Sequence, residues 1–187
     1  NNVRYNKYNW KHGAGNRAGK GNAGSFAGFV TGTAVNDITC TDITVNAKQS
    51  TGGLIGMVYY GGDAIINNVT VNSSKGKENI ITGSGQHNGI LIGFSNNLTT
   101  KGTLNITNTT LNAQNGQTAG LVGQVYNYNE AKDITLENVK ILGGQYAGGL
   151  VGMVETQGPI TVDNITLNNV SVSSSQNAGG IFGIACN

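Results

Sequence analysis

The sequence predicts an all-β fold, a parallel β-solenoid (β-helix) of five to six coils with about 30 residues per coil. Three observations predict it: a glycine motif that recurs at nearly constant spacing, an alternating segment between its copies, and a composition with 30 Gly, 1 Pro and 11% charged residues. Gly costs about 1 kcal/mol in a helix interior, and the abundant Asn and Thr compete for backbone hydrogen bonds. A helical bundle is therefore excluded.

The glycine motif has the form G-(L/I)-x-G and marks the start of each repeat. We call its copies the anchors; full copies occupy residues 53–56, 120–123, 149–152 and 180–183, and degenerate copies end at Gly28 and Gly93. A period near 30 residues is typical of a solenoid, in which each repeat buries its apolar face against its neighbours. The longest spacing, between positions 56 and 93, predicts the largest insertion at 73–84, and a second loop is expected at 126–132.

Between the anchors runs a segment of alternating polar and β-branched residues, which predicts a strand about eight residues long. Its copies begin at Ile38, Ala64, Leu104, Ile134 and Ile160. Aligning these copies predicts two inward columns, one of Cys40, Ile66, Ile106, Leu136 and Val162, the other of Ile43, Val69, Thr109, Val139 and Ile165.

Two polar columns accompany the strands. A glutamine precedes each anchor after the first, and an Asx residue lies within each segment; the residues are Gln49, Gln86, Gln117, Gln145 and Gln176, then Asp42, Asn68, Asn108, Asn138 and Asn164. Successive coils lie about 4.8 Å apart, so these side chains are expected to form ladders with their own kind. The alternative is that they are ordinary surface turn residues.

The full anchors resemble the GLUG motif, a repeat of bacterial surface adhesins and secreted proteases. The resemblance covers residues 24–187 and implies an extracellular, stalk-like or adhesive part, with no catalytic residue carried over. The first residues lie outside it, so we expect two parts, a basic and aromatic N-terminal segment at 1–22 and solenoid repeats at 23–187.

The N-terminal segment mixes basic and aromatic residues. An aromatic lid over the first coil or a contact between subunits is expected there, with Tyr5, Tyr8 and Trp10 as its anchoring side chains. Stacking on bases or sugars is the alternative. The glycine-rich stretch 13–24 lacks the residues of a phosphate-binding loop and is expected to be a flexible connector.

The remaining composition argues against most other classes. A net charge of +2 is too small to indicate a nucleic-acid partner, and no apolar run reaches the roughly 20 residues that span a bilayer. Nine acidic residues and two histidines form no visible catalytic or metal-binding pattern, so we expect no enzyme and no cofactor.

The chain carries seven N-x-(S/T) triplets, the acceptor sequence for N-linked glycans. They begin at Asn68, Asn72, Asn97, Asn105, Asn108, Asn164 and Asn169. In a host that glycosylates secreted proteins, the expected loop sites Asn72 and Asn97 are the first candidates.

The last repeat suggests a function. A solenoid without a distinct capping repeat leaves unpaired strands and a cut core at its end. Here nothing in the sequence covers Ile181, Phe182 and Ile184. A head-to-tail contact that does not close yields a filament. We therefore expect a secreted or cell-surface structural subunit that polymerises with itself.

Three alternatives qualify this expectation. Cys40 and Cys186 are expected on the first and last coils, too far apart to pair within one chain, so they either pair across a junction or remain free. The runner-up function is an adhesin stalk fragment that binds glycans or the host matrix through its loops. Ice binding is a third class, indicated by the pairs Thr39 with Thr41 and Thr107 with Thr109.

Overall fold

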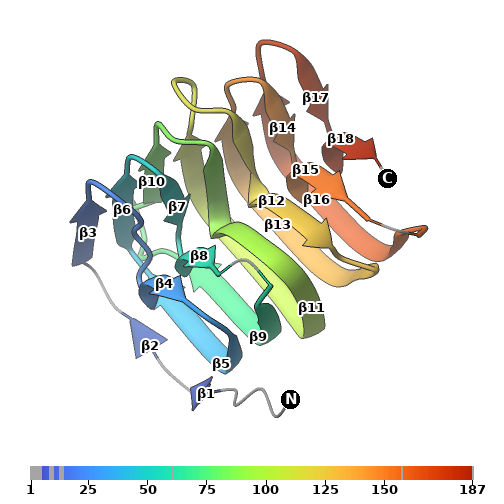
Figure 1. The fold of residues 1–187 in the computed structure, drawn as a ribbon. Helices are drawn as coiled ribbons and strands as arrows, with labels where there is room; N and C mark the ends of the chain where they lie inside the picture. The colour runs from blue at the N-terminus through green and yellow to red at the C-terminus, as the bar shows by residue number, and fades with distance from the viewer. Residues whose placement is uncertain (1–5, 9–10, 13–14, 60, 157, 187) are drawn as a thin grey trace.

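The computed structural model describes the chain except residues 1–5, 9–10, 13–14, 60, 157 and 187. The described residues form only strands and loops, stacked as a parallel β-solenoid of about five turns with roughly 31 residues per turn. The N-terminal strands, in blue, and the C-terminal strands, in red, lie at opposite ends of the stack (Figure 1). The predicted fold class is confirmed.

Eighteen strands are described, and every pairing between them is parallel. The first half of the chain contains β1 (Asn6–Tyr8), β2 (Lys11–His12), β3 (Gly15–Gly19), β4 (Ala27–Val30), β5 (Thr33–Thr41), β6 (Ile43–Ala47), β7 (Ser50–Gly52), β8 (Ile55–Val58), β9 (Asp63–Asn72) and β10 (Asn79–Gly83). The second half contains β11 (His87–Asn112), β12 (Thr118–Asn127), β13 (Glu130–Leu142), β14 (Tyr146–Gly148), β15 (Val151–Glu155), β16 (Thr161–Ser173), β17 (Asn177–Gly179) and β18 (Phe182–Cys186).

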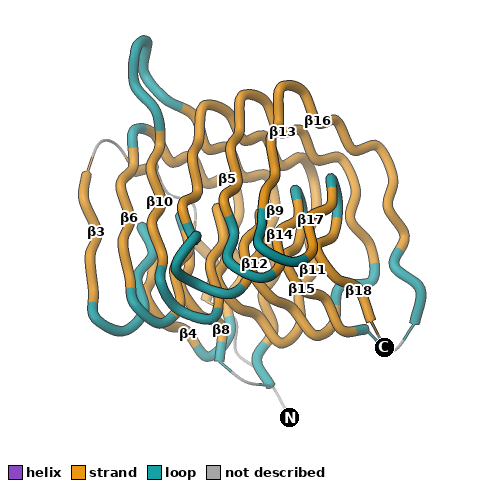
Figure 2. The backbone as a smooth tube through the Cα atoms, turned by 90° about the horizontal axis from the view of Figure 1, so that it is seen from above, coloured by secondary structure: helices purple, strands orange, loops and turns teal. Residues whose placement is uncertain are grey.

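Strands of successive turns lie side by side and form continuous walls (Figure 2). One wall, which we call the anchor wall, contains β4, β8, the first part of β11, β12, β15 and β18. Another contains β5, β9, the second part of β11, β13 and β16. Among the described residues there is no helix of the length and apolar character needed to cross a membrane.

The core fills the inside of the coil with apolar side chains that stack in columns from turn to turn. In-register pairing stacks Ile38, Val69, Leu104, Ile134 and Ile165, and beside them Cys40, Val71, Ile106, Leu136 and Leu167. The predicted columns were wrong for the copies at Ala64 and Ile160. The column of Cys40 contains Val71 and Leu167 in place of Ile66 and Val162, and that of Ile43 contains Asn79 and Val170 in place of Val69 and Ile165. Each turn holds two similar apolar runs separated by a bend, and the alignment matched the first run of some repeats to the second run of others.

The anchors owe their closing glycine to crowding between turns. A Cβ on Gly93 would lie 2.4 Å from the carbonyl oxygen of Gly56, and one on Gly123 would lie 2.6 Å from that of Gly93. Each turn therefore leaves room at this position only for a hydrogen, because a side chain would collide with the backbone of the preceding turn.

The insertions are only partly as expected. The loop 73–78 separates β9 from β10 and lies within the range predicted for the largest insertion. The prediction of a loop at 126–132 was wrong, because only residues 128–129 of this range lie outside the strands β12 and β13. Tyr128 is 2% exposed and its hydroxyl lies 2.8 Å from Thr100 Oγ1, so this residue fills the core. Burial raises the pKa of Tyr128 to about 12.

Three described stretches of the N-terminal segment, β1, β2 and β3, belong to the sheet. β1 and β2 pair with β5, and β3 pairs with β6. A flexible connector was therefore the wrong expectation for residues 15–19, whose backbone forms the edge strand β3.

Candidate assembly interface

The C-terminal turn, β16 to β18, is paired on one side only. β16 pairs with β13, β17 with β14 and β18 with β15, and no described strand lies beyond them. The exposure of the core columns changes accordingly: Leu136 is fully buried, whereas Leu167 on the next turn is half-buried. Ile181 and Phe182 are likewise half-buried, whereas Leu150 and Val151 one turn earlier are buried, and Val162 is 40% exposed. Ile184 is half-buried like its counterpart Met153. The end of the core is thus open.

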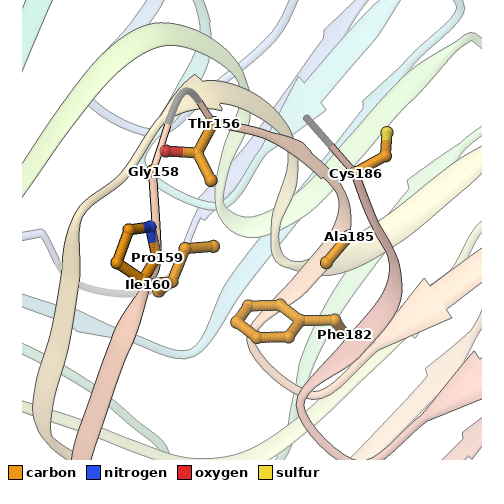
Figure 3. Close-up of a pocket in the computed structure, with 7 residues that line it drawn as sticks. All are labelled: Thr156, Gly158, Pro159, Ile160, Phe182, Ala185 and Cys186. Carbon is orange, nitrogen blue, oxygen red and sulfur yellow. The ribbon is translucent and has the colours of Figure 1, made fainter.

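A hollow of about 510 Å³ lies on this open end (Figure 3). Pro159 and Ile160 line one side of it, and Phe182 and Ala185 line the other. The exposed Cys186 lies at its rim, with its sulfur pointing away from Phe182. The residues that line the hollow expose mainly apolar area, which is better covered by another protein surface than by water.

The opposite end of the anchor wall is also unpaired, because β4 pairs with β8 alone among the described strands. The ring of Phe29 is 47% exposed and packs edge-on against Tyr59, with ring centroids 5.6 Å apart. A second hollow, of about 500 Å³, is lined by residues 26–27 and 29–33. The two ends of one wall therefore carry hollows of similar size.

The structure describes only some of the residues that we expected at the interface. Tyr5 and Trp10 lie outside the described residues, and Tyr8 is described only as part of the backbone of β1. Ile181, Phe182, Ile184 and Cys186 lie together on the C-terminal turn.

Cys40 is a correction to the expected interface. Both cysteines are free, but Cys40 is fully buried and β2 pairs along its strand. Burial raises the pKa of its thiol to about 12, which leaves it protonated and unreactive. A disulfide from Cys40 to a second molecule would require this core to open.

The predicted Asx column is in fact two columns. One runs through Asp37, Asn68, Asp133 and Asn164, and the other through Asp42, Asn108, Asn138 and Asn169. All eight residues have a φ between 49° and 57°, the left-handed conformation that Asn and Asp tolerate best. Three turns thus bend twice, five residues apart, at positions 37 and 42, 133 and 138, and 164 and 169. The predicted column mixed the two bends.

The ladders themselves are present and directional. Asn169 Nδ2 donates to Asn138 Oδ1 at 2.6 Å, and Asn138 Nδ2 donates to Asn108 Oδ1 at 3.3 Å. Asp42 accepts instead from the hydroxyl and N–H of Ser74, which lower its pKa in that order of importance. In every Asn pair the later turn donates to the earlier one.

A further ladder was missed by sequence reasoning. Asn97 Nδ2 donates to Asp63 Oδ1 at 2.6 Å, and Asn127 Nδ2 donates to Asn97 Oδ1 at 2.7 Å. Both asparagines stand four residues after the closing glycine of an anchor, a spacing that could have revealed them.

The glutamine ladder is wrong at the level of side chains. The backbones are in register, since the Gln145 N–H donates to the Gln117 carbonyl at 2.8 Å. However, no hydrogen bond joins the five described glutamine side chains to one another, and four of them are exposed, Gln49, Gln86, Gln117 and Gln176. They point to solvent at a corner of the coil.

The structure separates the seven glycan acceptor sequences. Five of the asparagines use their amide nitrogen as a ladder donor, Asn68, Asn97, Asn108, Asn164 and Asn169. Asn72 is half-buried and accepts from the Thr41 hydroxyl. Asn105 is exposed and takes part in no ladder, so it is the acceptor that a glycan would disturb least.

A hollow of about 330 Å³ lies on a third surface. It is lined by Asn22, Lys48, Gln49, Ser50, Met57, Gly85, Gln86 and His87. Ser50 Oγ lies 3.1 Å from His87 Nδ1, and burial lowers the pKa of His87 to about 4, so its ring is neutral at pH 7. Among the described residues no three His, Cys, Asp or Glu side chains gather as metal ligands.

The threonine pairs do not form the flat double row that ice binding needs. Thr39, Thr70 and Thr135 fall in one outward row with Asn105 between them. Thr109, however, is 1% exposed and belongs to the core. The row containing Thr41 and Thr107 continues with Glu137.

The candidate interface therefore combines the open C-terminal turn, the stacked anchors and the polar ladders. No protein-family model, no curated protein and no solved structure matches the chain.

Proposed function

We propose that this protein is a non-enzymatic structural subunit that stacks head to tail into an extracellular fibre. The observation that carries the proposal is the C-terminal turn, whose strands have a partner on one side and whose core residues are half-buried where their counterparts one turn earlier are fully buried. Unpaired strands and exposed apolar columns favour the addition of another turn.

A second copy is the occupant that suits this end best. Within the chain, each turn already stacks on the next through the same parallel pairing, so another turn of the same kind offers matching strand spacing and columns. The resemblance of the anchors to the GLUG repeat supports a secreted or cell-surface location. No cofactor and no catalysis form part of the proposal.

Gly180→Ala tests the proposal. Inside the chain, a Cβ on Gly149 would lie 2.1 Å from the carbonyl oxygen of Gly180 on the next turn, whereas a Cβ on Gly180 meets only Leu167 Cδ1, at 3.8 Å. Gly180→Ala should therefore leave the single chain folded but block a following copy. Fibres of the wild-type chain, seen by electron microscopy with an axial rise of about 25–30 Å per subunit, should be lost.

Ser171→Ala is the matched control, because Ser171 is exposed in β16 and points out of the coil. It should form fibres like the wild type. Wild-type chains that stay monomeric at high concentration in analytical ultracentrifugation would overturn the proposal. So would Gly180→Ala chains that remain folded and still form normal fibres.

An adhesin stalk is the second candidate, and the hollow beside Lys48 favours it. Amide and ammonium groups at Asn22, Lys48 and Gln86 are suited to sugar hydroxyls or acidic glycans. Binding to a glycan array that is lost in Lys48→Ala and Gln86→Ala, while Lys140→Ala retains it, would support this function.

A further inference from the structure

We infer that the fibre junction is an in-register parallel strand pair, with β18 of one copy lying against β4 of the next. The inference rests on the proposed head-to-tail assembly and adds its register: Phe182 opposite Ala27, Ile184 opposite Phe29 and Ala185 opposite Val30 of the second copy.

The register follows from the anchor wall. Ala27 pairs with Ile55, Ile55 with Ile92, Ile92 with Val122, Val122 with Val151 and Val151 with Phe182. All six residues therefore occupy equivalent positions on successive strands of the anchor wall. If a second copy continues the wall beyond Phe182, the next equivalent position is Ala27 of that copy.

The two edges also complement each other in size. Phe182 and Ala185 line the hollow on β18, whereas Ala27 and Val30 line the hollow on β4. In the inferred register a large side chain meets a small one at both inward pairs, Phe182 with Ala27 and Val30 with Ala185. The hollows of about 510 and 500 Å³ would be filled by each other's walls.

Backbone hydrogen bonds point the same way. Within the chain, the N–H of Phe26 donates to Leu54 at 2.9 Å, and the N–H of Leu150 donates to Ile181 at 2.9 Å. The next donor in this series, the N–H of Ile181, meets no further turn in the described chain. A second copy that continues the stack would bring the turn of β4 against this N–H.

One outward column makes the register measurable. Val30 pairs with Val58 and Glu155 pairs with Cys186, so Thr31, Tyr59, Glu155 and Cys186 occupy one column. Thr31 and Cys186 are both exposed. Across the inferred junction their Cα atoms would lie about 4.8 Å apart, within the range that a disulfide bridges.

The experiment is Thr31→Cys, oxidised with glutathione disulfide under assembly conditions. The two thiols lose two protons and two electrons, which reduce one glutathione disulfide to two glutathiones. Non-reducing gels should show a ladder of multimers that collapses on reduction. The wild type, with Cys186 as its only exposed thiol, can form at most a dimer.

Two controls fix the interpretation. Lys48→Cys places an exposed thiol at another corner of the coil and should give no ladder, and Thr31→Cys with Cys186→Ser should give none either. Fibres of Thr31→Cys that yield no ladder would overturn the register while leaving the fibre intact. Absence of fibres from the wild type as well as from Thr31→Cys would overturn the proposed function itself. An equal ladder from Lys48→Cys would overturn the register.

Discussion

At the scale of single residues, the bends of this solenoid are set by Asn and Asp in left-handed conformation. These residues have two roles. They tolerate the positive φ that the bend requires, and their side chains form hydrogen bonds with the neighbouring turn. Asn138 illustrates both roles, with φ of 54° and ladder bonds on either side.

Asn138→Gly and Asn138→Ala separate these roles. Both remove the ladder bonds, but Gly keeps the left-handed bend without strain, so Ala should cost about 1 kcal/mol more in free energy of unfolding. Urea denaturation of both variants checks this. Equal midpoints would show that the bend is not strained by a Cβ.

His87 should make stability depend on pH. Burial lowers its pKa from 6.5 to about 4 in the folded chain. The unfolded chain therefore binds the extra proton between these values, so stability is full above about pH 6.5 and falls as pH falls toward 4, by on the order of 2 kcal/mol for a half-buried ring. Unfolding curves at pH 7 and 4.5 should differ less in His87→Gln than in the wild type.

At the scale of elements, the sequence predicted the repeat period, the parallel strands and the largest insertion. It could do so because the glycine motif and the alternation of polar and apolar residues recur from turn to turn. It misassigned the columns, since two apolar runs of similar pattern alternate within a turn and only pairing distinguishes them. Asn79 shows the limit: it follows the insertion at 73–78 and lies fully buried in the column of Ile43 and Val139. No local pattern marks an asparagine as part of the core.

Asn79→Ala should destabilise the start of β10. Asn79 Oδ1 accepts the N–H of Ile43 at 2.8 Å, and its Nδ2 donates to the Asn72 carbonyl and to Thr109 Oγ1. An unpaired buried N–H should cost about 1–3 kcal/mol. Asn46→Ala, at an exposed position in β6, should change the denaturation midpoint little.

At the scale of the whole molecule, stability should fall toward the C-terminal turn, since β16 to β18 have neighbours on one side only. Amide hydrogen exchange in dilute, monomeric protein should be fastest there and slowest in β11 and β13. Assembly should slow exchange in β18 and β4 together. Unchanged exchange in both strands within fibres would contradict the inferred junction.

The candidate interface was predictable in location but not in composition. The uncovered last anchor indicated Phe182 and Ile184, and the structure places both on the open turn. Sequence could not show that Cys40 is sealed in the core or that β4 is the edge opposite β18, because both depend on how the turns pair.

The asparagine ladders give the stack a sense of direction. Asp37, Asp63 and Asp133 each begin a ladder, and a carboxylate can only accept, so the adjoining amide is forced to donate toward it and each later amide follows suit. Asn164, which donates to Asp133, thus presents its oxygen toward the open end. Asn169 presents its oxygen the same way, because its amide nitrogen donates to Asn138 on the preceding turn. A polymer of such units has two chemically different tips, and subunits would add to them at unequal speeds.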